Sequence, residues 1–543
     1  MKKYLFVLLV FWGTGLITHA QVNESSVNQL GNDNEATIEQ VGVSNISDVY
    51  QNGNQNIVGV QQSGYLNSSF VEEYGVGNEY YATQAETNLS IALQVGNYNL
   101  ADVDQLGTNY SYITQFLGDY NAAYLTQVGN LNLSIINQFF SDSETASVFQ
   151  QGFSNVANIM QWAGMYDEAT ISQCGKLNTA SILQEATFMN YALVSQNGFG
   201  NYAAIDQWLG DYNSSEIAQY GKMNTAFSDQ YLGSSNSSLI MQHGKMNYAY
   251  TYQVGGSMNS ASINQHGKFN EAYAIQSGGL NNESTISQKG NSNFSVTEQY
   301  GGIGNWADIN QQGKANSAYI YQYGGSLNWA FVSQYGKMNG AEVAQVDGYW
   351  NTVDINQEGK YNQAYVEQLD GSFNVTEVEQ YGSLNEAYIS QIDGSDTYAY
   401  IGQEGVSNYA EIIQVDNYES FAGVAQIGED NYAYIEQYQT SNTFSGIVQL
   451  GDGNVAEIGQ YNVDDSYAII EQYGYDNIAV SIQADGENNA AYTYQVGTDN
   501  TSYTTQIGSD NYVNVYQEGN GQTSIVTQYG NGNSATITQS NGY

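Results

Sequence analysis

The chain has 543 residues with no proline, 58 glycines, 49 tyrosines and one cysteine, and its formal net charge is −44 at neutral pH. Binding to phosphates needs clustered lysine and arginine, so this charge excludes a nucleic-acid-binding protein. Since 41% of the residues are hydrophobic, the chain is too apolar for a disordered acidic tail. The missing prolines suit a protein that uses nearly every backbone N–H in β-ladders.

Residues 1–20 have the composition of a secretory signal peptide. Lys2 and Lys3 precede an apolar run from Leu5 to Trp12, and we expect cleavage after Ala20. The alternative, a membrane anchor, would need about 20 apolar residues, and the run is shorter than that. No later segment is suited to membrane insertion, so we expect residues 21–543 to be secreted to the extracellular space or the cell surface.

One repeat occupies the rest of the chain. From Gln29 to Gln539, 46 positions recur about every 11 residues; all are glutamine except Glu73, and an asparagine stands six residues before 39 of them. Alanine or serine, then isoleucine or valine, lie between them at alternate positions. The unit is therefore N-x-A-x-[I/V]-x-Q, followed by a glycine two or three residues later.

Alternation with a period of two predicts a β-strand in each unit. Charged residues lie on the other face, so the Asn/Ala/Ile/Gln face is expected to be interior and the glycine to mark a turn. From Gln115 to Gln506 the spacing alternates between 12 and 11 residues, and near both ends it is mostly 11. We therefore predict an all-β fold, a flat β-solenoid with two short strands per coil of 22–23 residues and about 23 coils, continuous over residues 21–543 and stacked like cross-β structure.

The core of such a solenoid is thin, so amide ladders must contribute to cohesion. Stacked asparagine and glutamine side chains can hydrogen-bond to the coils above and below. A disordered Asn/Gln-rich tract is the alternative, but it would not keep register over 46 units. We take as representative ladder residues Asn305, Gln311, Asn316, Gln322, Asn328, Gln334, Asn339 and Gln345.

Residues 23 apart should stack into columns along the rod. One column holds Lys176, Lys222, Lys245, Lys268, Lys314, Lys337 and Lys360, and another holds, in order, Leu117, Phe140, Ala163, Ala186, Leu209, Leu232, Gly255, Gly278, Gly301, Gly324, Asp347, Asp370, Asp393 and Asp416. Stacked carboxylates repel one another, so we consider weak binding of divalent cations at the four aspartates; the alternative is a solvated acidic face.

Three interior positions carry acids instead of amides: Glu73, Glu144 and Asp167. A buried carboxylate without a cationic partner is costly, so we predict that these positions weaken the stack. We also predict that Glu73→Gln raises stability.

We find no catalytic or cofactor-binding constellation in the sequence, and expect neither enzymatic activity nor a cofactor. His243 and His266 are outward and one coil apart, while Cys174 lies three coils from His243, about 14 Å by coil spacing, too far for a shared metal. Cys174 has no histidine within reach to activate it as a nucleophile.

The phased Q-x-G-x-x-N-x-A pattern, as in residues 265–276, resembles the curlin repeat of curli fibre subunits over residues 23 to 539. The resemblance implies an exported subunit of functional amyloid fibres that helps Gram-negative cells adhere and form biofilm matrix. It implies self-association, with a nucleator subunit and an outer-membrane export pore as further partners. This chain departs from the family in having many more repeats and almost no separate N-terminal secretion segment.

Two functions follow from these expectations. In the first, the protein is a structural subunit whose uncapped end coils stack on other molecules. In the second, it is a monomeric rod-like adhesin, or a solenoid that binds a ligand or cations through its tyrosine rows and acidic edge.

Overall fold

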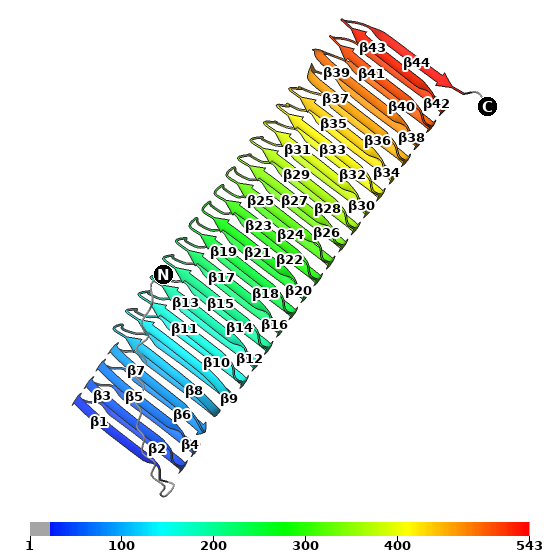
Figure 1. Cartoon of the computed structure of the whole chain (residues 1–543). Coiled ribbons are helices and arrows are strands. Elements are labelled where there is room, and N and C mark those ends of the chain that lie inside the picture. The colour runs from blue at the N-terminus through cyan, green and yellow to red at the C-terminus, as the bar shows by residue number, and fades with distance from the viewer. Residues whose placement is uncertain (1–21, 542–543) are drawn as a thin grey trace, which may run out of the picture.

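A computed structural model of the protein describes residues 22–541, and within this range the chain forms one long stack of 44 β-strands (Figure 1). The expected signal peptide, residues 1–20, lies outside the described residues. Among the described residues, no helix has the length and apolar character needed to cross a membrane.

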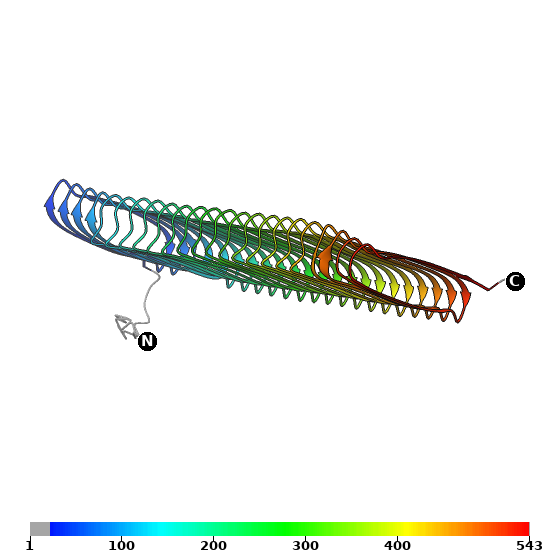
Figure 2. The ribbon, with the colours of Figure 1, turned by 90° about the horizontal axis from the view of Figure 1, so that it is seen from above.

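The strands form two layers, here called the first and the second face, which the chain visits alternately through arcs (Figure 2). Each strand pairs in parallel with the strand that lies one coil further on the same face. The first face contains β1 (Glu24–Asn32), β3 (Ile46–Asn54), β5 (Ser68–Val76), β7 (Leu89–Asn97), β11 (Val156–Trp162), β13 (Thr179–Glu185), β15 (Tyr202–Trp208), β17 (Thr225–Tyr231), β19 (Tyr248–Val254), β21 (Glu271–Ser277), β23 (Phe294–Tyr300), β25 (Ser317–Tyr323), β27 (Gly340–Val346), β29 (Gln363–Leu369), β31 (Glu386–Ile392), β33 (Tyr409–Val415), β35 (Tyr432–Tyr438), β37 (Val455–Asp464), β39 (Ile478–Glu487), β41 (Thr501–Ile507) and β43 (Thr523–Tyr529). The second face contains β2 (Glu35–Val43), β4 (Ile57–Tyr65), β6 (Glu79–Glu86), β10 (Thr145–Phe153), β12 (Glu168–Lys176), β14 (Tyr191–Phe199), β16 (Ser214–Lys222), β18 (Ser237–Lys245), β20 (Ser260–Lys268), β22 (Glu283–Asn291), β24 (Trp306–Lys314), β26 (Trp329–Lys337), β28 (Thr352–Lys360), β30 (Val375–Ser383), β32 (Tyr398–Val406), β34 (Phe421–Glu429), β36 (Phe444–Asp452), β38 (Tyr467–Tyr475), β40 (Ala490–Thr498), β42 (Tyr512–Asn520) and β44 (Ser534–Ser540).

Two long strands, β8 (Leu100–Phe116) and β9 (Ala122–Phe139), contribute to both faces. The first part of β8 pairs with β6 and its last part with β7, so the strand continues through the arc between the faces. Each long strand holds two glutamines of the repeat, and the 44 strands therefore contain the 46 expected units. The predicted fold class is confirmed: the protein is an all-β, parallel β-solenoid with about 23 residues per coil.

The predicted interior face is also confirmed. In β24 every second residue is buried, and the pairing with β26 stacks Ala307 on Ala330, Ile309 on Val332 and Gln311 on Gln334. The core therefore consists of columns of small and β-branched side chains, flanked by columns of amides.

Two kinds of arc join the faces. The short arc follows each glutamine of the second face, as in residues 312–315, and the long arc follows each glutamine of the first face, as in residues 323–327. The column that runs from Leu117 to Asp416 lies in the long arc. Its residue in every coil has a positive φ, between 52° and 70°. Glycine and aspartate tolerate this left-handed conformation better than most residues, so the backbone itself gives a reason for the aspartates in the column.

Candidate functional site: amide ladders and open coil edges

The buried glutamines form a hydrogen-bonded column in each face. The side-chain amide of Gln311 donates to Oε1 of Gln334 in the next coil at 2.8 Å, and to the backbone carbonyl of Phe294 on the opposite face at 2.9 Å. Its own oxygen accepts a hydrogen bond from Gln288. Because all its polar groups are paired, the amide is buried at little cost. Each glutamine donates towards the C-terminal end of the stack, which gives the column a direction.

The asparagines form a second column that fastens the arcs. The backbone N–H of Asn316 donates to Oδ1 of Asn293 in the preceding coil at 3.1 Å, and its side-chain amide donates to the carbonyl of Gly336 in the following arc at 3.4 Å. The structure places the eight representative ladder residues in these two kinds of column: Gln311, Gln322, Gln334 and Gln345 donate to the next glutamine, and Asn305, Asn316, Asn328 and Asn339 each bond to the preceding asparagine and to an arc carbonyl.

The glycine of the short arc permits the close approach of successive coils. Gly313 has φ +136°, and a Cβ at this position would overlap the carbonyl oxygen of Gly336 in the next coil. The same overlap recurs along the column, so no other residue fits without displacing the backbone. The Q-x-G spacing of the repeat follows from this packing.

Glu73 in β5 interrupts the glutamine column of the first face. It accepts a hydrogen bond from Gln51 at 2.9 Å, but its other oxygen and Oε1 of Gln94 in the next coil are buried without a donor. Burial raises the pKa of Glu73 to about 8, and the hydrogen bond from Gln51 opposes that rise. A protonated Glu73 can donate towards Gln94, so the column is complete here only when the acid is neutral.

Glu144 and Asp167 replace asparagines in adjacent coils of the second face and form a buried carboxyl pair. Burial raises the pKa of Glu144 to about 9, and it raises the pKa of Asp167 as well. Asp167 accepts hydrogen bonds from the hydroxyl of Thr187 at 2.7 Å and from the backbone N–H of Asn190 at 2.8 Å. These donors stabilise the ionised form of Asp167, whereas both carboxyl oxygens of Glu144 are buried without a hydrogen-bond partner, so burial favours the neutral form of Glu144 more strongly.

The four aspartates considered as cation ligands, Asp347, Asp370, Asp393 and Asp416, lie exposed on the long arcs of successive coils. Histidine, cysteine and carboxylate side chains of residues 22–541 form no group of three or more that could hold a metal ion. The structure therefore places the four in one column but brings no further ligand to them.

His243 and His266 lie together on the short arcs, with ring centroids 6.1 Å apart. Cys174, a free and half-buried cysteine, lies three coils away along the pairing of β12, β14, β16 and β18. The structure thus brings the two histidines together and leaves the cysteine apart from them.

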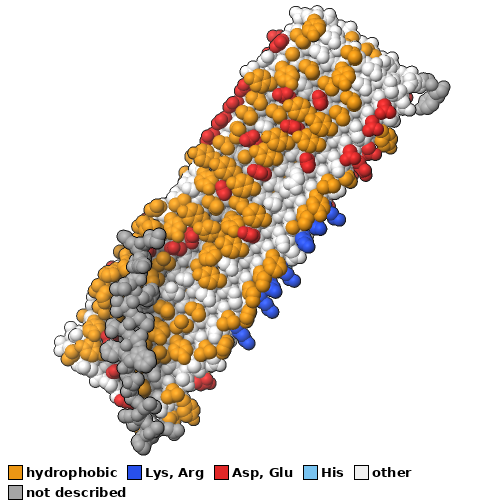
Figure 3. All heavy atoms as spheres, in the orientation of Figure 1, with side chains coloured by type: hydrophobic (Ala, Val, Ile, Leu, Met, Phe, Trp, Pro, Cys, Tyr) orange, Lys and Arg blue, Asp and Glu red, His pale blue; other side chains and the backbone are white. Residues whose placement is uncertain are grey.

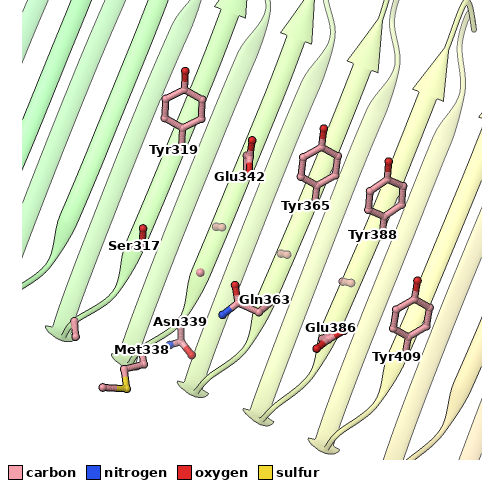
Figure 4. A pocket seen from close by; sticks show the side chains of 15 residues that line it. Ser317, Tyr319, Met338, Asn339, Glu342, Gln363, Tyr365, Glu386, Tyr388 and Tyr409 are labelled. Atoms are coloured by element: carbon pink, nitrogen blue, oxygen red, sulfur yellow. The ribbon is translucent and has the colours of Figure 1, made fainter.

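Tyrosines form outward rows on the strands. Tyr365 and Tyr388 stack with ring centroids 4.9 Å apart and an interplanar angle of 7°. Gly340, which has no side chain, leaves an open groove of about 470 Å³ near this row. Figure 4 shows Tyr365, Tyr388 and Tyr409 beside the groove in successive strands of the first face, and Glu342 between Tyr365 and Tyr319. The groove offers flat aromatic contact area for lateral packing.

The two ends of the stack are open. All nine residues of β1 are exposed, and β44 at the other end has an alternately exposed and half-buried pattern. At the N-terminal end Gln29 and Gln40 donate to the next coil, so the oxygens of both amides remain available as acceptors. The last glutamine of the first face, Gln528, accepts a hydrogen bond from Gln506, and its side-chain amide donates to the backbone carbonyl of Tyr512 at 3.1 Å. No following glutamine stands among the described residues of this face to accept from the second N–H of that amide.

Comparison with known protein families gives one family, described as the curlin associated repeat. Its model matches residues 31–64, 190–221, 256–290, 302–327, 351–382, 374–405 and 508–540. The matched segments include coils near both ends and in the middle of the stack. No curated protein matches the chain.

Proposed function

Because the chain is a curlin-repeat protein, we propose that it is a secreted structural subunit of curli-like amyloid fibres that act in cell adhesion and the biofilm matrix. The observation that carries the proposal is the pair of open ends, which match one another. A nucleating subunit and an outer-membrane export pore belong to the same proposal and are implied by the repeat family alone.

The C-terminal coil fits the N-terminal coil of a second molecule residue by residue. Gln528 and Gln29 are 499 residues apart, and so are Gln539 and Gln40, so both faces keep register at once. With this offset, Val526 meets Val27, Gly530 meets Gly31, Asn533 meets Asn34, Ala535 meets Ala36 and Ile537 meets Ile38. Apolar, glycine and amide columns therefore continue across the joint.

Hydrogen-bonding groups at the joint are complementary only in the head-to-tail direction. The amide of Gln528 donates one N–H to the carbonyl of Tyr512 and has a second N–H to offer at the C-terminal end, and the N-terminal end presents the oxygen of Gln29 as an acceptor. No side chain of residues 519–543 is charged, so the acidic side chains of the N-terminal coil meet no carboxylate side chain there. Stacking thereby pairs the free strand edges that would otherwise remain unsatisfied.

The proposal is tested by incubating the purified mature chain and following thioflavin fluorescence with and without fibre seeds. We expect seeded fibres with a meridional X-ray reflection near 4.8 Å, the spacing of stacked strands. Persistent monomers at high concentration and physiological salt would instead support the rod-like adhesin.

Blocking the C-terminal edge is expected to stop growth without unfolding the rod. In each coil the outward-facing residue after the asparagine donates its backbone N–H to the next coil, as Glu35 does to the carbonyl of Asn56. In a parallel ladder the N–H groups of alternate residues point the same way. Thr527 and Thr538 are outward-facing residues of the last coil, so their N–H groups point to the open end. Thr527→Pro with Thr538→Pro removes these two donors, and we expect at least a tenfold slower elongation.

The matched control is Thr527→Val with Thr538→Val, which keeps both N–H groups and a β-branched side chain. Circular dichroism should show the same strand content for both double variants. Equal elongation rates for the proline and valine variants would contradict growth at this edge.

A further inference from the structure

The edge formed by the short arcs carries two stretches of opposite charge. Lysines occupy its central coils and carboxylates its C-terminal coils, as blue and red side chains show along one edge of Figure 3. The lysines are Lys176, Lys222, Lys245, Lys268, Lys289, Lys314, Lys337 and Lys360, and the carboxylates beyond them are Glu404, Glu429, Asp430, Asp452, Asp476, Asp499 and Glu518. One carboxylate, Glu358, lies within the lysine stretch, in the same short arc as Lys360.

The lysine stretch places like charges directly beside one another. The strand register stacks Lys222 on Lys245 and Lys245 on Lys268 in consecutive coils. Further along, it stacks Lys314 on Lys337 and Lys337 on Lys360. Neighbouring like charges in a parallel ladder are unfavourable, so these rows favour a partner that supplies the opposite charge at the same coil spacing.

The two stretches are arranged symmetrically about one coil without charged residues on this edge. In the coil of Gln380 the short arc presents Tyr381, Ser383 and Leu384. Counting coils outwards from it, a lysine on the N-terminal side corresponds to a carboxylate on the C-terminal side for six consecutive coils. The pairs are Lys360 with Glu404, Lys337 with Asp430, Lys314 with Asp452, Lys289 with Asp476, Lys268 with Asp499, and Lys245 with Glu518.

We propose that this edge is the interface of an antiparallel pair formed with a second copy of the chain, with the two-fold axis at the coil of Gln380. A two-fold axis makes every contact occur twice, so each lysine stretch faces the carboxylate stretch of the other copy. The residues at the axis meet their own counterparts. Leu384 is 51% exposed and Tyr381 is 37% exposed, and they provide apolar contact between the charged stretches.

The pairing does not depend on fibre formation, because it uses the side of the rod and leaves both ends open. The C-terminal coils overlap with the central coils of the partner, and the coils from Gln40 to Gln196 project at each end. A pair is therefore about one third longer than a single rod, since each coil adds a constant rise. An acidic polymer could also occupy the lysines, but it would leave the matching carboxylate stretch unexplained.

The test uses sedimentation velocity and small-angle X-ray scattering of the full mature chain carrying Thr527→Pro and Thr538→Pro, so that end stacking does not contribute. In this background we expect a dimer that dissociates at high salt and that is about one third longer than a single rod. Lys268→Glu should weaken dimerisation at least tenfold, because it opposes Asp499 of the partner in both copies. Adding Asp499→Lys to the same chain should restore the dimer.

The register is tested by a mismatched swap. Lys268→Glu combined with Asp430→Lys keeps the same net charge as the matched swap but places the new lysine at the wrong coil, and we expect no recovery. In a Cys174→Ser background, Ser383→Cys should form an intermolecular disulfide, whereas Asn130→Cys, in a projecting coil, should not. The proposal is overturned if the chain stays monomeric in all these variants. A monomeric chain that binds polygalacturonate through its lysines would overturn it in the same way.

Discussion

Glu73→Gln is expected to raise the free energy of unfolding of the N-terminal coils by roughly 3 kcal/mol at pH 7. The glutamine supplies the missing N–H between Gln51 and Gln94 and removes a buried acid. The ordinary pKa of 4.5 applies in the unfolded chain, against about 8 in the folded one. Below pH 4.5 both states hold the proton and Glu73 carries no penalty.

Between pH 4.5 and 8 only the folded state holds the proton, so the stability of the wild type falls as the pH rises, and above pH 8 the loss is complete. Hydrogen exchange of peptides from β5 at pH 5 and pH 8 measures this dependence. Glu72→Gln is the matched control, because Glu72 is the exposed neighbour in the same strand. If the gain in the free energy of unfolding from Glu73→Gln did not grow with pH, ionisation of Glu73 would not be the cause of the lower stability.

The buried carboxyl groups of Glu144 and Asp167 should also make the stability of the rod fall as the pH rises. Glu144 has its pKa raised to about 9 and Asp167 also has its pKa raised, so the coils that hold them take up a proton on folding at neutral pH. The first third of the rod should therefore be more stable in mild acid than in mild base. This part of the chain contains all three buried interior acids.

Gly313→Ala, like the same change at the other glycines of its column, is expected to destabilise the rod strongly, by about 3 kcal/mol or more. The alanine must adopt φ +136° and its Cβ must displace the carbonyl of Gly336, so the two coils cannot keep their spacing. Because each coil contacts only its neighbours, we expect the damage to be local. Hydrogen exchange should show loss of protection in β24 and β26 with little change at the ends of the rod.

Gly340→Ala provides the control within the adjacent coil. Gly340 lies in the outer face of β27 without a positive φ, and an added Cβ meets only the flexible end of the Gln363 side chain. We expect no loss of protection there, since alanine suits a half-buried, outward-facing strand position at least as well as glycine. Equal damage from both substitutions would show that the short-arc overlap is not what makes Gly313 necessary.

Much of the fold could be predicted because every unit carries the same local pattern. The alternation from Asn305 to Gln311 specifies a strand and its interior face, and the constant spacing specifies which residues stack. The lysine column and the column ending in Asp416 were correctly aligned for the same reason. The sequence count of 46 units also holds, although β8 and β9 each combine two units into one strand.

Other features depend on backbone geometry that the pattern does not contain. The left-handed conformation of Leu117, Leu209 and their equivalents in the long arc has no signal in those residue types, because leucine seldom adopts it. The partners of Asp167 were also beyond prediction, since the hydroxyl of Thr187 reaches it across an irregular arc.

The sequence by itself determined that this protein is a stack of two-stranded coils, because period-two alternation and a fixed repeat length leave one consistent way to bury the amides and the aliphatic side chains. Only the tertiary structure decided the direction of each hydrogen-bonded column, the left-handed arcs and the burial of Glu144 without a hydrogen-bond donor. These depend on where donors and acceptors lie in three dimensions, and hydrogen-bond geometry between coils is not encoded in the spacing of residues along the chain.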